Sequence, residues 1–261
     1  MAALAGVLPL AESCSVKEDR SDCPCMLTLD FSDVDYDLLL EAGLTEMGII
    51  VASESGICVR KSVSLKEAPG ECVMAVPRSR VNLCAVCGGG GGFMDSSVIV
   101  GENEECPKYY VCFDSFEALS NAVTRKVILH RNHCFLKVRL KDSPALPSKR
   151  FYVTVEGDVC GFDIYGEPVT GLFRAGSDES SGGTCSVCLP RQRDGSLSLQ
   201  IHFPGSKDIR SFPIGDYILQ SGYDWTAPDL EDIEVEVDFS LTGVSFTIDS
   251  WKKTLYFEIR F

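Results

Sequence analysis

The stretch SLSLQIHF, residues 196–203, alternates apolar and polar side chains along its whole length. Successive side chains of a β-strand point to opposite faces of the sheet, so this pattern predicts a strand with one buried and one solvated face. The apolar face is formed by Leu197, Leu199, Ile201 and Phe203. A strand of this kind is typical of an antiparallel sheet, which can leave one face open to water.

Working outward, five further segments are rich in β-branched and aromatic residues and are separated by clusters of Gly, Pro, Asp and Ser. They are CFLKVRL (134–140), FYVTV (151–155), IEVEVDF (233–239), GVSFTI (243–248) and TLYFEIRF (254–261). Short strands at this spacing favour antiparallel sheets. We therefore expect a mainly β fold, an antiparallel β-sandwich or barrel-like core.

Two short helices are expected beside the sheets. In residues 29–43, Ser32 can cap a helix, three consecutive leucines supply an apolar face, and Gly43 can end it. In residues 114–128, apolar side chains recur at helical spacing. They are Phe116, Leu119, Val123 and Val127.

The length and composition are those of a folded, acidic protein. The chain has 261 residues, 45% of them hydrophobic, which is enough to bury a sizeable core. We expect a single β-rich domain over residues 1–261, with residues 1–82 as a semi-independent N-terminal part. The 38 acidic and 24 basic residues give a net charge of −14, which disfavours attraction of the whole surface to nucleic acid or to an anionic membrane.

The cysteine content favours a reducing compartment. The chain has 13 cysteines, an odd number, and it is long enough not to depend on disulfides. Residues 1–13 contain an apolar run, but no Lys or Arg precedes it and Pro9 interrupts it, so a signal segment is not favoured. These observations predict a cytoplasmic or nuclear protein.

Two Cys-x-x-Cys motifs are the strongest chemical signal: CAVCG at 84–88 and CSVCL at 185–189. Two thiolates at this spacing on a tight turn can bind one Zn²⁺ at sulfur distances near ~2.3 Å. The motifs resemble the knuckles of zinc-ribbon domains, and the resemblance implies that two such turns close one tetrahedral site. We expect a structural zinc ion held by Cys84, Cys87, Cys185 and Cys188.

Other uses of these cysteines stay open. Cys106 and Cys112 could replace the second pair as ligands of a site with Cys84 and Cys87. The thiols could also be ordinary buried side chains, because cysteine is among the most buried residue types. A redox role is disfavoured, since no βαβ context surrounds either motif. The glycine run at 88–92 lacks the lysine and the following helix of a phosphate-binding loop, which excludes a nucleotide cradle.

Residues 125–150 form a basic segment, with eight basic residues and one acidic residue. Such a segment can hold phosphate or an acidic partner, although a strand with a solvated basic face is the simpler interpretation. Within it, HRNHC places His130, His133 and Cys134 close together in sequence. These could bind a metal or form a Cys/His pair, but a plain connection between elements is favoured.

The function favoured by these patterns is an intracellular, zinc-stabilised protein that binds other proteins without catalysis. It would be a regulator or adaptor, including a viral accessory or host-modulating protein. One alternative is an enzyme with a cysteine nucleophile or catalytic zinc, which predicts His130, His133 or His202 beside a cysteine. Another is a phosphate or nucleic-acid binder through residues 125–150, which predicts that the basic side chains share one face.

The expected partner is a protein of unknown identity, and neither membrane nor nucleic acid is expected to bind. Aromatic residues in the C-terminal third would anchor such a partner if they were exposed. They are Tyr217, Tyr223 and Trp225.

Overall fold

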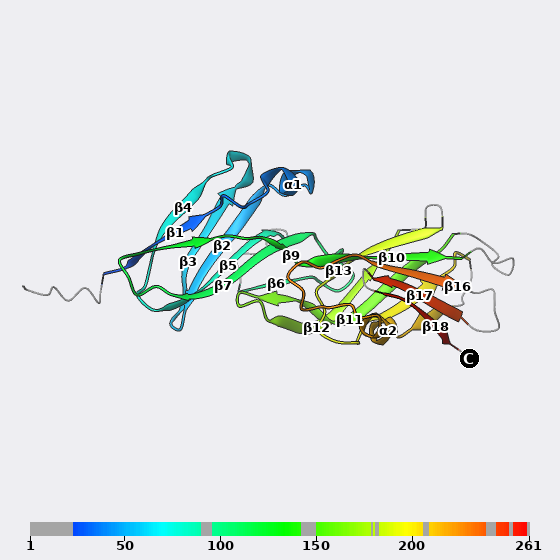
Figure 1. Ribbon diagram of the computed structural model, residues 1–261. Helices are drawn as coiled ribbons and strands as arrows, with labels where there is room; N and C mark the ends of the chain where they lie inside the picture. Colours follow the sequence, from blue (N-terminus) through cyan, green and yellow to red (C-terminus); the bar gives the residue numbers. More distant parts are fainter. Residues whose placement is uncertain are drawn as a thin grey trace, which may run out of the picture.

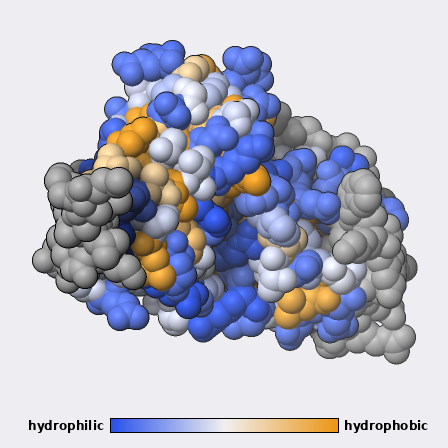
Figure 2. All heavy atoms as spheres, turned by 60° about the vertical axis from the view of Figure 1, so that its left-hand side comes forward, coloured by the Kyte–Doolittle hydropathy of each residue, from blue (hydrophilic) through white to orange (hydrophobic). Residues whose placement is uncertain are grey.

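The computed structural model describes residues 23–89, 96–141, 150–178, 180, 183–205, 209–238, 244–250 and 253–259. These residues form two β-rich lobes that lie end to end (Figure 1). Seen from the side of the N-terminal lobe, the surface is hollowed where the lobes meet, and hydrophilic residues predominate around the hollow (Figure 2).

Two sheets build the N-terminal lobe. In the first, β1 (Cys25–Asp30) is antiparallel to β4 (Glu71–Val76) and parallel to β8 (Ala122–Lys126). The second is antiparallel, in the order β3 (Gly56–Ser64), β2 (Glu46–Ser53), β5 (Arg80–Gly88), β7 (Tyr109–Glu117) and β9 (His130–Arg131). Helix α1 (Tyr36–Glu41) follows β1, and a short 3₁₀ helix, η1 (Leu65–Glu67), follows β3.

Two more sheets build the C-terminal lobe. One has the order β13 (Thr184–Pro190), β10 (His133–Leu140), β16 (Ile233–Asp238), β17 (Val244–Ser250) and β18 (Lys253–Ile259), with β10 and β16 parallel. The other has the order β12 (Pro168–Gly176), β11 (Tyr152–Asp163), β14 (Ser198–His202) and β15 (Ile209–Phe212), and β6 (Ser97–Ile99) also pairs with β11. Helix α2 (Ile214–Gln220) follows β15.

Strand β5 lies between two hydrophobic cores, because both of its faces are buried. The smaller core, between the two sheets of the N-terminal lobe, takes one face of β5: Val81, Leu83, Ala85 and Cys87. The larger core, which continues into the C-terminal lobe, takes the other face: Cys84 and Val86. Burial on both faces accounts for the nearly continuous apolar sequence of this strand.

The predicted fold class is confirmed: the protein is mainly β, its sheets are largely antiparallel, and its α-helices are short. The six predicted strands correspond to β10, β11, β14, β16, β17 and β18. In β14, Leu199 and Ile201 are fully buried while Ser198, Gln200 and His202 are half-buried, as the alternation predicts.

The helix expected in residues 29–43 is confirmed in a shorter form. The segment up to Asp30 belongs to β1. Asp35, rather than Ser32, caps the helix, because its Oδ1 accepts a hydrogen bond from the backbone N–H of Leu38 at 3.0 Å. Gly43 follows the helix with a φ of 83°, a conformation that favours glycine.

The helix expected in residues 114–128 is wrong. Strand β7 runs to Glu117 and β8 begins at Ala122. Phe116 points from β7 into the smaller core, whereas Leu119 is 60% exposed in the connection. Pairing of these strands with β5 and β1 satisfies their backbone groups and overrides the helical periodicity.

Helix α2 occurs in a segment that carries loop-like residues. Pro213 precedes it and Gly215 lies in its first turn. A Cβ atom at Gly215 would lie 2.3 Å from the carbonyl oxygen of Gly195, so the helix can pack this closely only with glycine at that position.

The smaller core includes residues from Cys25 to Val127 and so extends beyond residue 82, the predicted end of the N-terminal part. Independent folding of that part stays a prediction.

Candidate functional site

A groove of about 1000 Å³ lies between helix α1 of the N-terminal lobe and residues 229–234 of the C-terminal lobe. Strands β7, β9 and β10 provide its floor. Its lining residues are Leu38, Glu41, Ala42, Lys108, Tyr110, Arg131, His133, Phe135, Asp229, Leu230, Glu231, Asp232 and Glu234.

The floor of the groove is an aromatic cluster around His133. The His133 ring centroid lies 5.6 Å from that of Tyr110 and 5.9 Å from that of Phe135, both in edge-on geometry. Its Nδ1 lies 3.0 Å from the carbonyl oxygen of Tyr109. Burial lowers the pKa of His133 to about 4, so the imidazole is neutral at pH 7. The aromatic cluster is therefore uncharged, and Arg131 is a charged side chain beside it.

Arg191 holds the segment that leads into the C-terminal wall. Its Nε donates to Asn132 Oδ1 at 2.5 Å. Its two terminal nitrogens donate to the carbonyl oxygens of Trp225, Ala227 and Pro228, at 2.8 Å for Ala227 and 3.0 Å for Pro228. Several donors on one planar group thus hold three carbonyl groups of residues 225–228 in place.

Two aspartates of the C-terminal wall, Asp229 and Asp232, bind to strands β9 and β10. Asp229 accepts from the backbone N–H of Arg131 at 2.6 Å and contacts His130 Nδ1 at 3.0 Å. Asp232 accepts from the backbone N–H of Phe135 at 3.1 Å and pairs with the side chains of Arg131 and Lys137. Although burial opposes it, these hydrogen bonds and cations lower the pKa of Asp232, which is ionised at neutral pH.

The N-terminal wall is the outer face of α1. Leu39 anchors the helix, since it is 2% exposed in the smaller core. Leu38, by contrast, is 47% exposed, and Glu41 is exposed at the last turn. The helix therefore presents one apolar and one acidic side chain to the groove.

The four predicted zinc ligands do not lie on turns. Cys84 and Cys87 lie within β5, and Cys185 and Cys188 lie within β13. Residues three apart in a strand point to opposite faces, and Cys84 accordingly lies in the larger core while Cys87 lies in the smaller one. The predicted zinc-knuckle geometry is therefore wrong.

The competing ligand set is divided by the same sheet. Cys106 lies in the larger core with Cys84, and Cys112 lies in the smaller core with Cys87. Among the residues that the structure describes, no group of three or more His, Cys, Asp or Glu side chains is placed to hold a metal ion. Ligation of zinc by Cys84, Cys87, Cys185 and Cys188 stays a prediction from the sequence.

The buried thiols have the chemistry of core side chains. Burial raises the pKa of Cys87 and of Cys134 to about 12, and it also raises the pKa of Cys84 and Cys185. They are protonated at neutral pH in the metal-free chain, whereas nucleophilic attack requires the thiolate.

The three histidines have partners other than cysteine. His130 contacts Asp229, His133 contacts the Tyr109 backbone, and His202 Nε2 lies 3.1 Å from Thr154 Oγ1. His133 and Cys134 are adjacent in β10 and so point to opposite faces. These contacts therefore do not have the geometry of a Cys/His catalytic pair.

The basic segment 125–150 does not form one basic face. Arg125 and Lys126 lie in the N-terminal lobe and pair with Asp114 and Asp33, each at 2.7 Å. Further along, Arg131, Lys137 and Lys141 pair with carboxylates of the C-terminal lobe. Residues 142–149 lie outside the described residues. The described part is split between lobes and largely neutralised, which counts against phosphate or nucleic-acid binding there.

The aromatic residues expected to anchor a partner serve the interior instead. Trp225 is 3% exposed, and Tyr223 donates its hydroxyl to the Glu231 carbonyl at 2.7 Å, which braces the groove wall. The groove residues themselves were not found from the sequence. The signal available was the acidic run in residues 229–236, whose position opposite α1 depends on the fold.

No protein-family model matches this chain, and no curated protein matches its sequence. Solved structures nevertheless share its fold over nearly all of its length. The fimbrial anchor protein Mfa2 from Porphyromonas gingivalis matches with a TM-score of 0.61 and 10% identity, covering 89% of this chain and 100% of that one.

Two further solved structures match in the same way. A candidate polysaccharide-binding protein from Bacteroides thetaiotaomicron has a TM-score of 0.59 and 12% identity, covering 90% of this chain and 98% of its own. A candidate adhesin from Bacteroides ovatus has a TM-score of 0.58 and 13% identity, covering 90% and 95%. At these identities the likeness shows a common fold.

These comparisons correct the predicted function. The three solved proteins described above are from bacteria, and two of them are named for fimbriae or adhesion. The prediction of an intracellular, zinc-stabilised adaptor in the cytoplasm or nucleus is therefore wrong, and so is the viral accessory or host-modulating role. No helix among the described residues is long and apolar enough to span a membrane.

Proposed function

We propose that this protein acts at a bacterial cell surface, as a component of fimbriae or of a related adhesion structure. One observation carries the proposal. The chain matches a fimbrial anchor protein over 89% of its own length and 100% of the other chain, so the two-lobed arrangement as a whole is shared rather than one common sheet.

The role within such a structure is to bind another protein. A fimbrial component must contact its neighbouring subunits, and the prediction of a protein partner agrees with that requirement. The negative charge of −14 suits an exposed, soluble surface. The groove between the lobes is a suitable place for such a contact, because its walls are held by a network of hydrogen bonds and ion pairs.

The location is tested on intact bacteria that carry the gene. An antibody raised against the purified chain is used to follow the protein after protease treatment of whole cells, with a cytoplasmic protein as the protected control. Fimbriae sheared from the same cells are sedimented and probed with the antibody.

We expect the protein to be degraded on intact cells and to sediment in part with the sheared fibres. Protection equal to that of the cytoplasmic control, together with absence from the fibres, would overturn the proposal.

A further inference from the structure

The groove between the lobes carries a surplus of negative charge. Its lining contains five carboxylates and two cations, and a third cation, Lys137, pairs with two of these carboxylates from beside the groove. The carboxylates are those of Glu41, Asp229, Glu231, Asp232 and Glu234, and the lining cations are Lys108 and Arg131. The imidazole of His133 adds no positive charge at neutral pH. A groove lined by one sign of charge concentrates oppositely charged groups from solution.

The carboxylates divide into those that build the groove and those that face outward. Asp229 and Asp232 are engaged by hydrogen bonds and ion pairs that shape the wall, and Glu234 lies 3.8 Å from Lys137 Nζ. Glu41 and Glu231 are exposed, one on each side of the groove. A positively charged side chain between the lobes would meet carboxylates from both walls.

Between these carboxylates the lining includes apolar side chains, although Arg131 lies over the Phe135 ring at 5.8 Å. Leu38 is 47% exposed, and Tyr110 and Phe135 are half-buried in the floor. These side chains can cover the hydrocarbon part of a lysine or arginine, or a neighbouring apolar residue. Acidic walls over an apolar floor therefore fit a peptide segment better than a small inorganic cation.

We propose that the groove binds a lysine- or arginine-bearing segment of a partner protein. The proposal rests on the proposed function, and it names the chemistry of the partner. A second copy of this chain fits poorly, because its net charge of −14 would repel the first copy. Nucleic acid is disfavoured for the same reason.

The test measures binding of two short fluorescein-labelled peptides to the purified full chain by fluorescence anisotropy. One peptide alternates lysine and valine, and the other alternates glutamate and valine. We expect the lysine peptide to bind, the glutamate peptide to bind at least about tenfold more weakly, and added salt to weaken the lysine peptide.

Charge-reversal variants locate the binding. Glu41→Lys and Glu231→Lys should each weaken the lysine peptide by about tenfold, since each replaces an attraction by a repulsion at short range. Lys108→Glu should strengthen it by a few-fold, because it removes a cation from the lining. Glu54→Lys is the matched control: Glu54 is exposed in the connection between β2 and β3 and is not part of the groove.

The proposal would be overturned if the two peptides bound equally or if the lysine peptide did not bind. It would also be overturned if the groove variants and the control variant had equal effects on binding. Circular dichroism verifies that each variant folds. If the peptide-binding test failed, the protease and sedimentation results on cells would still support the proposed function. If the lysine peptide bound as expected but the protein were protected from protease on intact cells, only the proposed function would be overturned.

Discussion

Replacement of Arg191 by lysine should loosen one wall of the groove while keeping the charge. The guanidinium donates four hydrogen bonds, to the Asn132 side chain and to the carbonyl oxygens of Trp225, Ala227 and Pro228. A lysine ammonium can replace one or two of these, because it is a compact group without the planar fork of arginine. Two or three hydrogen bonds are therefore lost.

The expected cost follows from that loss. At about 1 kcal/mol of net stability per hydrogen bond, Arg191→Lys should lower the free energy of unfolding by about 2–3 kcal/mol. For a protein of this size the melting temperature should fall by roughly 5–10 °C. Urea unfolding followed by circular dichroism measures the first quantity. Hydrogen exchange should show faster exchange of amides in residues 225–232 and little change in β1.

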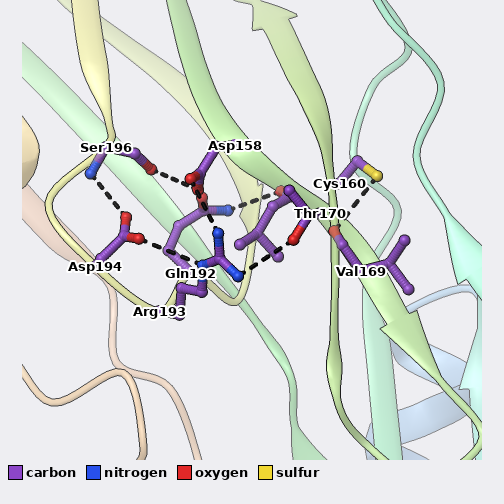
Figure 3. Close-up of polar contacts among 9 residues, drawn as sticks. Asp158, Cys160, Val169, Thr170, Gln192, Arg193, Asp194 and Ser196 are labelled. Carbon is purple, nitrogen blue, oxygen red and sulfur yellow. Dashed lines mark hydrogen bonds and ion pairs between the residues drawn. The ribbon is translucent and has the colours of Figure 1, made fainter.

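Arg193→Lys is the matched control on the same loop. Arg193 reaches Asp158, Asp194 and Thr170 at 3.2–3.3 Å, but its side chain is 44% exposed (Figure 3). Exposed ion pairs contribute little, so we expect a loss below about 1 kcal/mol. An Arg191→Lys variant as stable as the wild type, or an equal loss in both variants, would refute the reasoning about the clamp.

Three further predictions concern the core, the pH dependence and the metal. A Cβ atom at Gly157 would lie 2.8 Å from Gln192 Oε1, so Gly157→Ala should lower the free energy of unfolding by about 1–3 kcal/mol in urea titrations. Addition of Gln192→Ala should recover part of that loss, and strict additivity would contradict this explanation. Folding lowers the pKa of Asp232 below its ordinary 3.8, so its stabilisation is present above that pH and is lost as the pH falls through the folded-state value. Asp232→Asn should therefore reduce the difference in urea midpoint between pH 7 and pH 3, and an unchanged difference would count against the assignment. Cys84 and Cys87 lie on opposite faces of β5, so Cys84→Ser and Cys87→Ser should leave the zinc content unchanged in elemental analysis, whereas zinc lost from either variant would support the site predicted from the sequence.

The sheets could be predicted from the sequence because half-buried strands carry a visible alternation. In β14 the alternation gave both the strand and its buried face, with Leu199 and Ile201 inside. Strand β5 has no such alternation, because cores lie on both of its sides. Its Cys-x-x-Cys pair therefore resembled a metal-binding turn, although the spacing places Cys84 and Cys87 on opposite faces.

The groove could not be predicted, because its walls come from distant parts of the chain. Glu41 lies at the end of α1 and Glu231 lies just before β16. Neither residue belongs to a sequence motif. The distance between them depends on how β9 and β10 connect the two lobes. The hydrogen bonds of Arg191 could not be predicted either, because its acceptors lie 34–59 residues away in the sequence and are mostly backbone carbonyls.

The separation of the cysteines by β5 also makes oxidation and alkylation informative about unfolding. Ten described cysteines are buried, and they fall into two groups. Cys25, Cys72, Cys87 and Cys112 belong to the smaller core, and Cys84, Cys106, Cys134, Cys160, Cys185 and Cys188 belong to the larger core. A buried thiol reacts only when its surroundings open, so the order in which the two groups are modified would report which core opens first.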